Sequence, residues 1–309
     1  MIYDLCFAWN WEYDSDFAQL FENACRNKGL SLLQITPDNL ESMVQALTSD
    51  QLRFQAFLDR ASDSDERFLP FVQWAKENAI HRFNRFRIAR RASNKVISHY
   101  QLIQASLHTP YTIILPAFHD YPDLSPFDLV SLGTSFTIKP AHGGGGLGVI
   151  TAATSWEQVL MARQEYPDDQ YLLQAQVTSA ILDGREAWFR VIYCEGIAYP
   201  CWWNTHTHIY TPLTTDEMDR YHLHPITNIM TSIENICELD LFSTEIALTL
   251  DGLFMVVDYV NDPIDLRLQS KATDGVPDQI VSHIAESLVE RVSAMVIPTK
   301  NFSQAIVMP

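Results

Sequence analysis

Residues 137–149 read Thr137-Ile138-Lys139-Pro140-Ala141-His142-Gly143-Gly144-Gly145-Gly146-Leu147-Gly148-Val149. Five of the 11 glycines of the protein lie here, within six positions. Main-chain amides in such a loop can approach phosphate oxygens closely because no Cβ intervenes, and Lys139 adds a positive charge at the end of the preceding strand. The spacing matches neither the P-loop nor the dinucleotide-binding glycine fingerprint. The stretch therefore predicts a phosphate-covering loop, with a flexible hairpin that binds no ligand as the alternative.

The segments around the glycine loop have strand and helix patterns. Short strands are expected at 111–115, 135–139, 149–152 and 171–177, and a helix capped by Thr154 or Ser155 is expected at 155–165. The loop thus connects two strands of a small α+β unit.

Acidic side chains bracket a predicted hairpin later in the chain. Glu245 precedes an Asp-Gly pair at 251–252, and Asp258 and Asn261 follow it. An Asp-Gly pair favours a two-residue turn between antiparallel strands, so Glu245 and Asp258 are expected to lie near each other. Two carboxylates and an amide oxygen suit Mg²⁺ that keeps its other ligands for phosphate. The alternative is a group of surface residues at a strand end.

The first sixty residues alternate between strand and helix patterns. Strands are expected at 2–9, 30–35 and 52–59, with helices beginning near Asp14 or Ser15 and covering 40–47. Gly29 falls where a left-handed helix cap belongs. This alternation predicts a parallel α/β domain, in which the loops after the strands collect ligands. A further helix is expected at 278–296.

Composition and charge restrict the class of protein. The 309 residues are 47% hydrophobic and 19% charged, which is typical of a packed globular protein. With 21 Lys+Arg against 38 Asp+Glu the net charge is −17, so general binding to nucleic acid is not expected. We expect no membrane span, no membrane partner and a cytoplasmic location, with a homodimer as the default assembly. The five scattered cysteines are expected to be reduced, buried thiols.

One long stretch departs from the acidic composition. Between Asn78 and His119 there is no acidic residue, although six of the 21 cations lie there. A solvated helix face, or a contact with acidic surface elsewhere in the protein, is the ordinary interpretation. A binding site for an anion is the alternative.

Together these motifs resemble those of the ATP-grasp superfamily over residues 94–265. The matching segments are Asn94-Lys95 ahead of Thr109-Pro110-Tyr111-Thr112, Ile138-Lys139-Pro140 with the glycine loop, Leu172-Leu173-Gln174-Ala175-Gln176-Val177, Gly184-Arg185-Glu186 with Arg190-Val191, and Glu245 with Asp258 and Asn261. The resemblance implies an α/β (α+β) ATP-grasp fold with three parts. These are an N-terminal parallel α/β domain at 1–92, a central subdomain at 93–177 and a C-terminal subdomain at 178–309, the last two clasping the nucleotide.

The resemblance also implies ATP and Mg²⁺ as cofactors and assigns site residues. The cofactor-binding residues it implies are Lys95, Lys139, His142, Gly143, Gly144, Gly145, Gly146, Gly148, Gln174, Ala175, Gln176 and Val177. Glu245, Asp258 and Asn261 are the implied metal ligands, and Arg190 and Lys139 are the implied catalytic residues.

Three features depart from the pattern of the superfamily. One is a pair of extra residues, Trp188-Phe189, between the turn at 184–186 and the arginine strand. Ala175 stands where the adenine-binding hinge usually has an acidic residue, so adenine would depend on main-chain groups. The spacing Asp258-x-x-Asn261 is one residue longer than usual and puts Tyr259 where an acid is expected. A bulge in the strand, or metal contact through Asp262, would accommodate it.

The function implied is that of an ATP-dependent ligase, which activates a carboxylate as an acyl phosphate and joins it to an amine or similar nucleophile. Its substrates would be a small-molecule or short-peptide carboxylate and an amine acceptor. The alternatives are a small-molecule kinase on the same fold and a nucleotide-binding protein without catalysis.

Two His-x-His pairs, at 206–208 and 222–224, would suit a transition metal on a strand face, although hydrogen-bonded or solvent-facing histidines are the more common case.

Overall fold

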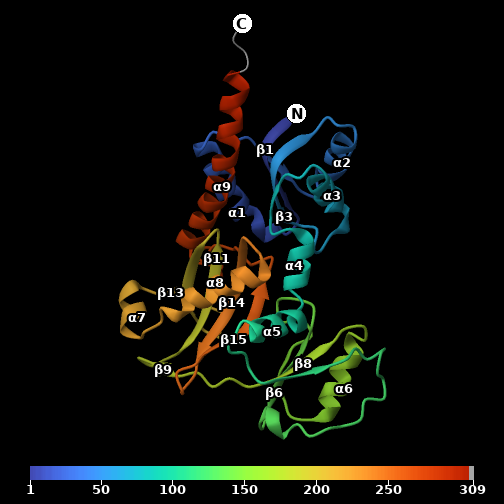
Figure 1. Ribbon diagram of the computed structural model, residues 1–309, viewed down its shortest axis with the longest axis vertical. Coiled ribbons are helices and arrows are strands. Elements are labelled where there is room, and N and C mark those ends of the chain that lie inside the picture. Colours follow the sequence, from blue (N-terminus) through green and yellow to red (C-terminus); the bar gives the residue numbers. More distant parts are fainter. Residues whose placement is uncertain (306–309) are drawn as a thin grey trace.

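The computed structural model describes residues 1–305, with side chains described through residue 296. Three sheets and a short hairpin follow one another along this part of the chain (Figure 1). A parallel sheet comes first and two antiparallel sheets follow, so the predicted fold class is confirmed. The predicted domain borders at 92/93 and 177/178 stay predictions, and the last four residues of the 178–309 unit lie outside the described residues.

The first sheet is parallel, with the strand order β2-β1-β3-β4. Its elements are β1 (Ile2–Trp9), α1 (Ser15–Asn27), β2 (Leu32–Ile35), α2 (Leu40–Thr48), β3 (Arg53–Arg60), α3 (Leu69–Glu77) and β4 (His81–Phe83). α1 packs on one face of the sheet, whereas α2 and α3 pack on the other. The alternation predicted from the sequence is confirmed, including the left-handed Gly29 after α1 at φ +66°. α3 and β4 extend it beyond the predicted elements.

The second sheet is antiparallel, with the order β5-β8-β6-β7. Its elements are β5 (Thr112–Leu115), β6 (Phe136–Pro140), β7 (Ile150–Ala153), α6 (Trp156–Glu165) and β8 (Tyr171–Ala175). α6 covers one face through Val159 and Ala162, and it begins at a capping box formed by Ser155 and Gln158. The glycine loop joins β6 to β7. Lys139 and Thr137 lie on the face that α6 leaves open, because alternate residues of β6 are buried beneath it.

The third sheet is antiparallel, with the order β13-β12-β11-β14-β15. Its elements are β11 (Trp188–Cys194), β12 (Ile197–Trp203), β13 (Tyr210–Pro212), α8 (Pro225–Cys237), β14 (Leu241–Leu248) and β15 (Phe254–Asn261). α8, which the sequence analysis did not predict, packs on one face through Ile226, Met230 and Ile233. The remaining elements are β9 (Ile181–Leu182), β10 (Arg185–Glu186), α4 (Phe86–Ala92), α5 (Lys95–Gln104) and α7 (Thr215–Arg220).

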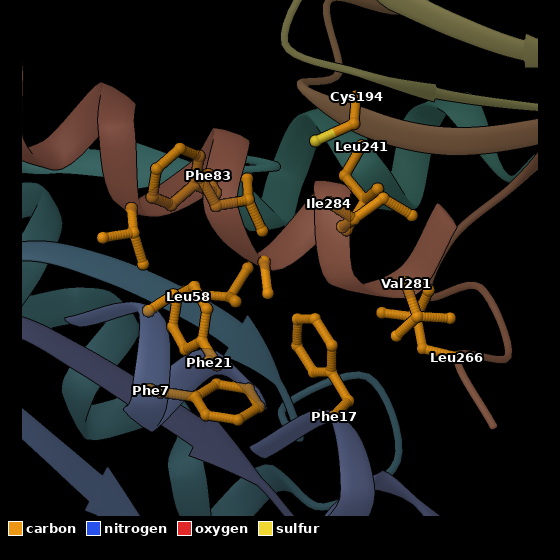
Figure 2. Packing of buried hydrophobic residues seen from close by; sticks show 14 of the residues in the cluster. Phe7, Phe17, Phe21, Leu58, Phe83, Cys194, Leu241, Leu266, Val281 and Ile284 are labelled. Atoms are coloured by element: carbon orange, nitrogen blue, oxygen red, sulfur yellow. The ribbon is translucent and has the colours of Figure 1, made fainter. Parts of the chain in front are cut away.

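One long helix, α9 (Asp278–Ala305), joins the first and third sheets. It begins where the sequence predicted and continues beyond the predicted end at residue 296. Figure 2 shows Val281 and Ile284 of α9 in one buried cluster with Phe7 of β1, Phe21 of α1 and Leu241 of β14. Each of these side chains is nearly inaccessible to solvent, and burial of one such side chain contributes about 1.5–3 kcal/mol. The two sheets therefore share a core.

Two local predictions are corrected by the structure. The Asp251-Gly252 pair does not form a two-residue turn: Thr249 and Leu253 close a loop of three residues, in which Gly252 has φ +82°. The His-x-His pairs at 206–208 and 222–224 lie outside strands, and His208 and His222 have positive φ values. Neither pair has the strand alternation that a shared metal site would need.

The cysteines and the apolar segments agree with the sequence analysis. All five cysteines are free and buried, and burial raises the pKa of each thiol. They are therefore poor nucleophiles. Among the described residues, no helix is both long and apolar enough to cross a bilayer.

A buried ion pair ties the end of β3 to the start of α1. Arg60 donates to both carboxylate oxygens of Asp14 at 2.7 and 3.0 Å, and its Nη2 also donates to the Ile264 carbonyl at 2.8 Å. The two side chains are 4% and 1% exposed. Because Ile264 follows β15, this arginine connects the first sheet to the chain that leaves the third.

We predict that Asp14→Ala lowers the free energy of unfolding by about 3–5 kcal/mol, because it leaves the Arg60 charge buried without a carboxylate. The matched control is Asp50→Ala, which removes the exposed partner of Arg53 at the other end of the same strand. Urea unfolding of both variants measures the difference, and we expect no change in the control. Equal effects in the two variants would contradict the assigned role of burial.

Candidate functional site

Three charged side chains lie side by side across the third sheet. Arg190 on β11 pairs with Glu245 on β14, and Glu245 pairs with Asp258 on β15. Arg190 Nη1 donates to Glu245 Oε1 at 2.9 Å, and Arg190 Nη2 donates to Ser243 at 3.3 Å. The predicted proximity of Glu245 and Asp258 is thus observed as a direct register pair, and it places an arginine on the other side of Glu245.

The strand that carries Asp258 is irregular at this point. β15 has register shifts on both sides of the Glu245–Asp258 pair, so extra residues bulge out of the ladder. The bulge lets Asn261 turn back, and its Nδ2 donates to Asp258 Oδ2 at 2.8 Å. Of the two alternatives for the long Asp258-x-x-Asn261 spacing, the structure therefore has the bulge.

Tyr259 and Asp262 point to other parts of the molecule. The Tyr259 hydroxyl lies 2.6 Å from His99 Nδ1 and accepts a hydrogen bond from Gln174 at 2.5 Å. Asp262 accepts from Asn84 Nδ2 at 2.6 Å and lines a small cavity beside the first sheet. Neither side chain joins Glu245 and Asp258.

The two carboxylates of the row have opposite pKa shifts. Burial raises the pKa of Glu245, and the charge of Asp258 opposes the lowering effect of Arg190. Burial would also raise the pKa of Asp258, but Lys139, Arg190, the hydrogen bond from Asn261 and Lys95 together lower it. Asp258 is therefore the carboxylate held in its ionised form.

Both predicted lysines face Asp258 from outside the third sheet. Lys139 on β6 donates to the Val257 carbonyl at 3.3 Å, directly beside Asp258. Lys95, the first residue of α5, donates to the Gly143 carbonyl at 2.5 Å. Burial lowers the pKa of Lys95, and Asp258 and Lys139 are the next largest influences on it. The structure thus brings Lys95, Lys139, Arg190, Glu245 and Asp258 together between the second and third sheets.

The glycine loop has a backbone that most residues cannot adopt. Gly143, Gly145, Gly146 and Gly148 have φ values between +62° and +97°, whereas Gly144 does not have a positive φ. A Cβ at any position from Gly143 to Gly146 would meet nothing within 4 Å, so this part of the loop is open to solvent. At Gly148 a Cβ would lie 2.7 Å from the Tyr166 ring. The loop is therefore anchored at Gly148 and unrestrained at its tip.

His142 connects the glycine loop to its surroundings. Its Nδ1 lies 2.9 Å from Asp169 and its Nε2 lies 2.9 Å from the Asn94 side-chain amide. Because the Asn94 oxygen accepts from Ile97, the Asn94 amide donates to His142. The ring then carries its proton on Nδ1. These contacts hold the base of the loop against α5, and a cavity of about 420 Å³ lies beside it, lined in part by His142, Gly143 and Leu147.

The predicted hinge lies at the end of β8. Gln174 is buried, and its side-chain amide donates to Tyr259 and, at 3.3 Å, to Thr112. The main-chain amide of Ala175 donates to the Tyr111 carbonyl at 2.9 Å. Gln176 is exposed and donates to Thr137 at 3.2 Å, and Val177 follows it outside the strand. The hinge side chains thus connect β8 to β15 through Gln174 and to β6 of the same sheet through Gln176.

Three contacts of the site were missed from the sequence. Trp188 Nε1 donates to Glu245 Oε2 at 3.1 Å, and the Trp203 ring lies 5.0 Å from the Arg190 guanidinium carbon. Asp169 holds both the ring and the main chain of His142. Trp188 lies two residues before Arg190 on β11, so the two side chains are on the same face of the sheet. This spacing is the signal that could have identified Trp188.

Arg190 and the carboxylates can serve a charged ligand. Arg190 Nε is buried and has no hydrogen-bond partner among the described residues, so one strong donor remains for an anion. No three His, Cys, Asp or Glu side chains in the described part of the chain are grouped to hold a metal. Glu245 and Asp258 are register partners and Asn261 lies beside Asp258. Their assignment as magnesium ligands, through two carboxylates and the Asn261 side-chain oxygen, stays a prediction.

Comparisons with known proteins identify structures of similar shape. No protein-family model and no curated protein sequence matches the chain. D-cycloserine synthetase DcsG is 16% identical, with a TM-score of 0.60 and coverage of 94% of this chain and 100% of that one. The ATP-grasp ligase PsnB, complexed with the precursor peptide PsnA2 and AMPPNP, is 12% identical, with a TM-score of 0.60 and coverage of 94% and 96%. D-alanine--D-alanine ligase from Bacillus anthracis, complexed with ATP, is 13% identical, with a TM-score of 0.62 and coverage of 96% and 98%. At these identities the likeness shows a shared fold.

The anchor of the glycine loop gives a prediction. Gly148→Ala should lower the free energy of unfolding by about 1–3 kcal/mol, because it combines a positive φ with a clash against the Tyr166 ring. Gly144→Ala is the matched control and should leave stability unchanged, since its φ is ordinary and its surroundings are open. Urea unfolding of the two variants distinguishes them, and a larger loss at Gly144 would contradict the described loop.

Asp262 gives a prediction about pH. Burial raises the pKa of Asp262 to about 7, so between pH 4 and pH 7 the folded protein holds a proton that the unfolded chain releases. Stability from this group therefore falls as the pH rises. We expect Asp262→Asn to be more stable than the native protein by about 1–3 kcal/mol at pH 8 and equal to it at pH 4. Urea unfolding at both pH values tests this, and equal stability at pH 8 would contradict it.

Proposed function

Because the chain has the ATP-grasp fold, we propose that it is an ATP- and Mg²⁺-dependent ligase. It would convert a substrate carboxylate to an acyl phosphate and join the acyl group to an amine or similar nucleophile. Three structures of this fold, covering nearly the whole chain, bear the names of a synthetase and of two ligases, and two of them hold ATP or AMPPNP.

The observation that carries the proposal is the convergence of opposite charges on Asp258. Lys95 and Lys139 approach it from α5 and β6, and Arg190 lies across the row from it on the third sheet. Two lysines, an arginine and two carboxylates in one partly buried cluster suit a polyphosphate with its magnesium ion. A cleft built only to pack two lobes together would not require the unused donor of Arg190.

Each group of residues would have a separate role in phosphoryl transfer. Lys95 and Lys139 would neutralise the phosphates that stay on the nucleotide, while Arg190 would bind the transferred group. Glu245, Asp258 and Asn261 would hold Mg²⁺, which would neutralise phosphate charge. The amides of residues 143–148 would cover the phosphates, and the hinge at 174–177 would hold adenine. Positioning and charge suffice here, because phosphoryl transfer needs little covalent help.

The chemistry balances in two steps. A carboxylate oxygen of the substrate attacks the γ-phosphorus of ATP, which forms the acyl phosphate and releases ADP. The amine then attacks the acyl carbon and expels inorganic phosphate. Closure of the glycine loop, whose tip has open space around it, would exclude water, which would otherwise hydrolyse the acyl phosphate.

We propose the substrates by chemical class. Structures of this fold bear names that connect them with a small amino acid or with a precursor peptide, so we propose a small-molecule or peptide carboxylate and an amine acceptor. Five free, buried cysteines are consistent with the reducing cytoplasm as the place of the reaction.

We predict that Lys139→Ala and Asp258→Asn each reduce ADP formation at least about a hundredfold, because each removes a charge that acts on the phosphates. ADP release is measured with Mg·ATP over a panel of amino acids, short peptides and carboxylates, with and without EDTA. The control is Lys76→Ala, an exposed lysine of α3 on the first sheet, which should retain full activity. Thermal unfolding of all variants checks that they remain folded.

The outcomes separate the proposal from its alternatives. A ligase releases ADP and free phosphate in equal amounts, whereas a kinase releases ADP and a phosphorylated product without free phosphate. ATP binding without any ADP formation would indicate a nucleotide-binding protein. Unchanged turnover in both Lys139→Ala and Asp258→Asn would falsify the catalytic assignment.

A further inference from the structure

Three arginines on one helix lack the partners that all similar arginines have. Every other exposed arginine of the described chain forms an ion pair with a carboxylate. Arg87, Arg90 and Arg91 of α4 are exposed, and none of them has a carboxylate within 4.0 Å or a side-chain hydrogen bond in the described structure. In a protein of net charge −17, three unpaired cations on seven consecutive residues are an exception.

The spacing of these arginines gives them one common face, which we call the arginine face. Positions i, i+3 and i+4 of a helix are neighbours on its surface, and Arg87, Arg90 and Arg91 have this spacing. The opposite side of α4 packs into the core through Ile88, Ala89 and Ala92. Like charges at this spacing destabilise a helix, and no acidic residue in the stretch from Asn78 to His119 relieves the repulsion. Arg90 lies over the Phe86 ring at 5.8 Å and lines a cavity together with Asp59, Asp63 and Asp262. The solvated-face interpretation leaves the other two arginines of the face without a stabilising partner.

The arginine face lies beside the proposed catalytic cleft. α4 connects the first sheet to α5, whose first residue is Lys95 (Figure 1). Arg90 also lines the small cavity that contains Asp262, and Asp262 directly follows Asn261 on the strand of Asp258. A chain bound along α4 would therefore lie next to the start of α5, where Lys95 is located.

We propose that the arginine face docks an acidic segment of a polypeptide, and that this polypeptide carries the group that the cleft modifies. The second half of this statement rests on the proposed ligase function, whereas the docking itself does not. The bound segment would pair its carboxylates with Arg87, Arg90 and Arg91, whose planar guanidinium groups match carboxylates in bidentate geometry.

The geometry of α4 favours an extended acidic chain. Arg87 and Arg91 are separated by about 6 Å along the helix axis, at about 1.5 Å per residue. Alternate residues of an extended chain project to the same side about 6.6–6.8 Å apart, so an acid-x-acid sequence matches the two arginines. The acidic remainder of the surface disfavours a long polyanion such as a nucleic acid, whereas a short segment stays within one screening length of the arginine face.

The test measures binding without ATP. The probe is a fluorescein-labelled peptide of four Glu-Gly repeats, and the matched neutral probe has four Gln-Gly repeats. Fluorescence anisotropy with the full-length protein should show binding of the Glu peptide alone, with affinity that falls as salt rises. Arg87→Glu/Arg91→Glu should weaken binding by about tenfold or more, because it removes two ion pairs and adds two repulsive charges. Arg26→Glu/Lys76→Glu makes the same change in net charge on other helices and should leave binding unchanged.

Several results would overturn the proposal. These are equal binding of the Glu and Gln peptides, unchanged binding by Arg87→Glu/Arg91→Glu, or tighter, arginine-dependent binding of an oligothymidylate. If the charge-reversal variant fails to fold, Arg87→Gln/Arg91→Gln gives the same comparison without added repulsion.

Two further variants separate docking from catalysis. Lys139→Ala should lose ADP formation and keep peptide binding, whereas Arg87→Glu/Arg91→Glu should lose peptide binding and keep ATP binding. Arginine-dependent peptide binding in a protein that forms no ADP would remove the ligase function and leave the docking surface.

Discussion

The site depends on a single constraint, the register of three strands that places Arg190, Glu245 and Asp258 in one row. Burying two carboxylates next to each other is unfavourable unless cations compensate them, because desolvation and mutual repulsion act in the same direction. Arg190 compensates from within the sheet, and Lys139 and Lys95 compensate from β6 and α5. The row therefore favours a close approach of the second sheet to the third. A slip of one residue in either strand pair would turn one of the three side chains to the opposite face.

The predicted pairing of Glu245 with Asp258 is right although the turn from which it followed is wrong. A two-residue turn at 251–252 would pair these residues directly. The observed three-residue loop shifts the register by one, so that Leu248 pairs with Phe254 and Ile246 with Val256. The bulge between Val256 and Asp258 then shifts it back. Sequence patterns predict turn residues and strand segments well. A bulge depends on what both strands pack against, and no local sequence pattern predicted this one.

The features that were predictable are local, and those that were missed are contacts across the fold. The glycine loop, the capped helix α6 and the alternation of the first sheet each follow from residues within about a dozen positions. By contrast, the contacts of Tyr259 with Gln174 and His99 join three elements that are far apart in sequence. They explain why Tyr259 replaces an expected acid: its hydroxyl belongs to the packing between α5, β8 and β15.

The charge distribution connects the two proposed sites. Acidic residues outnumber basic ones almost two to one over the whole chain, and most exposed arginines are neutralised by a carboxylate neighbour. Unneutralised positive charge is concentrated on α4 and continues into the cleft through Lys95 at the start of the next helix. An anionic ligand is repelled by most of such a surface and attracted by one strip of it, so its encounters are focused there. The field that would draw a triphosphate to Lys95 and Lys139 would also orient an acidic substrate along α4, with its reactive end toward Arg190.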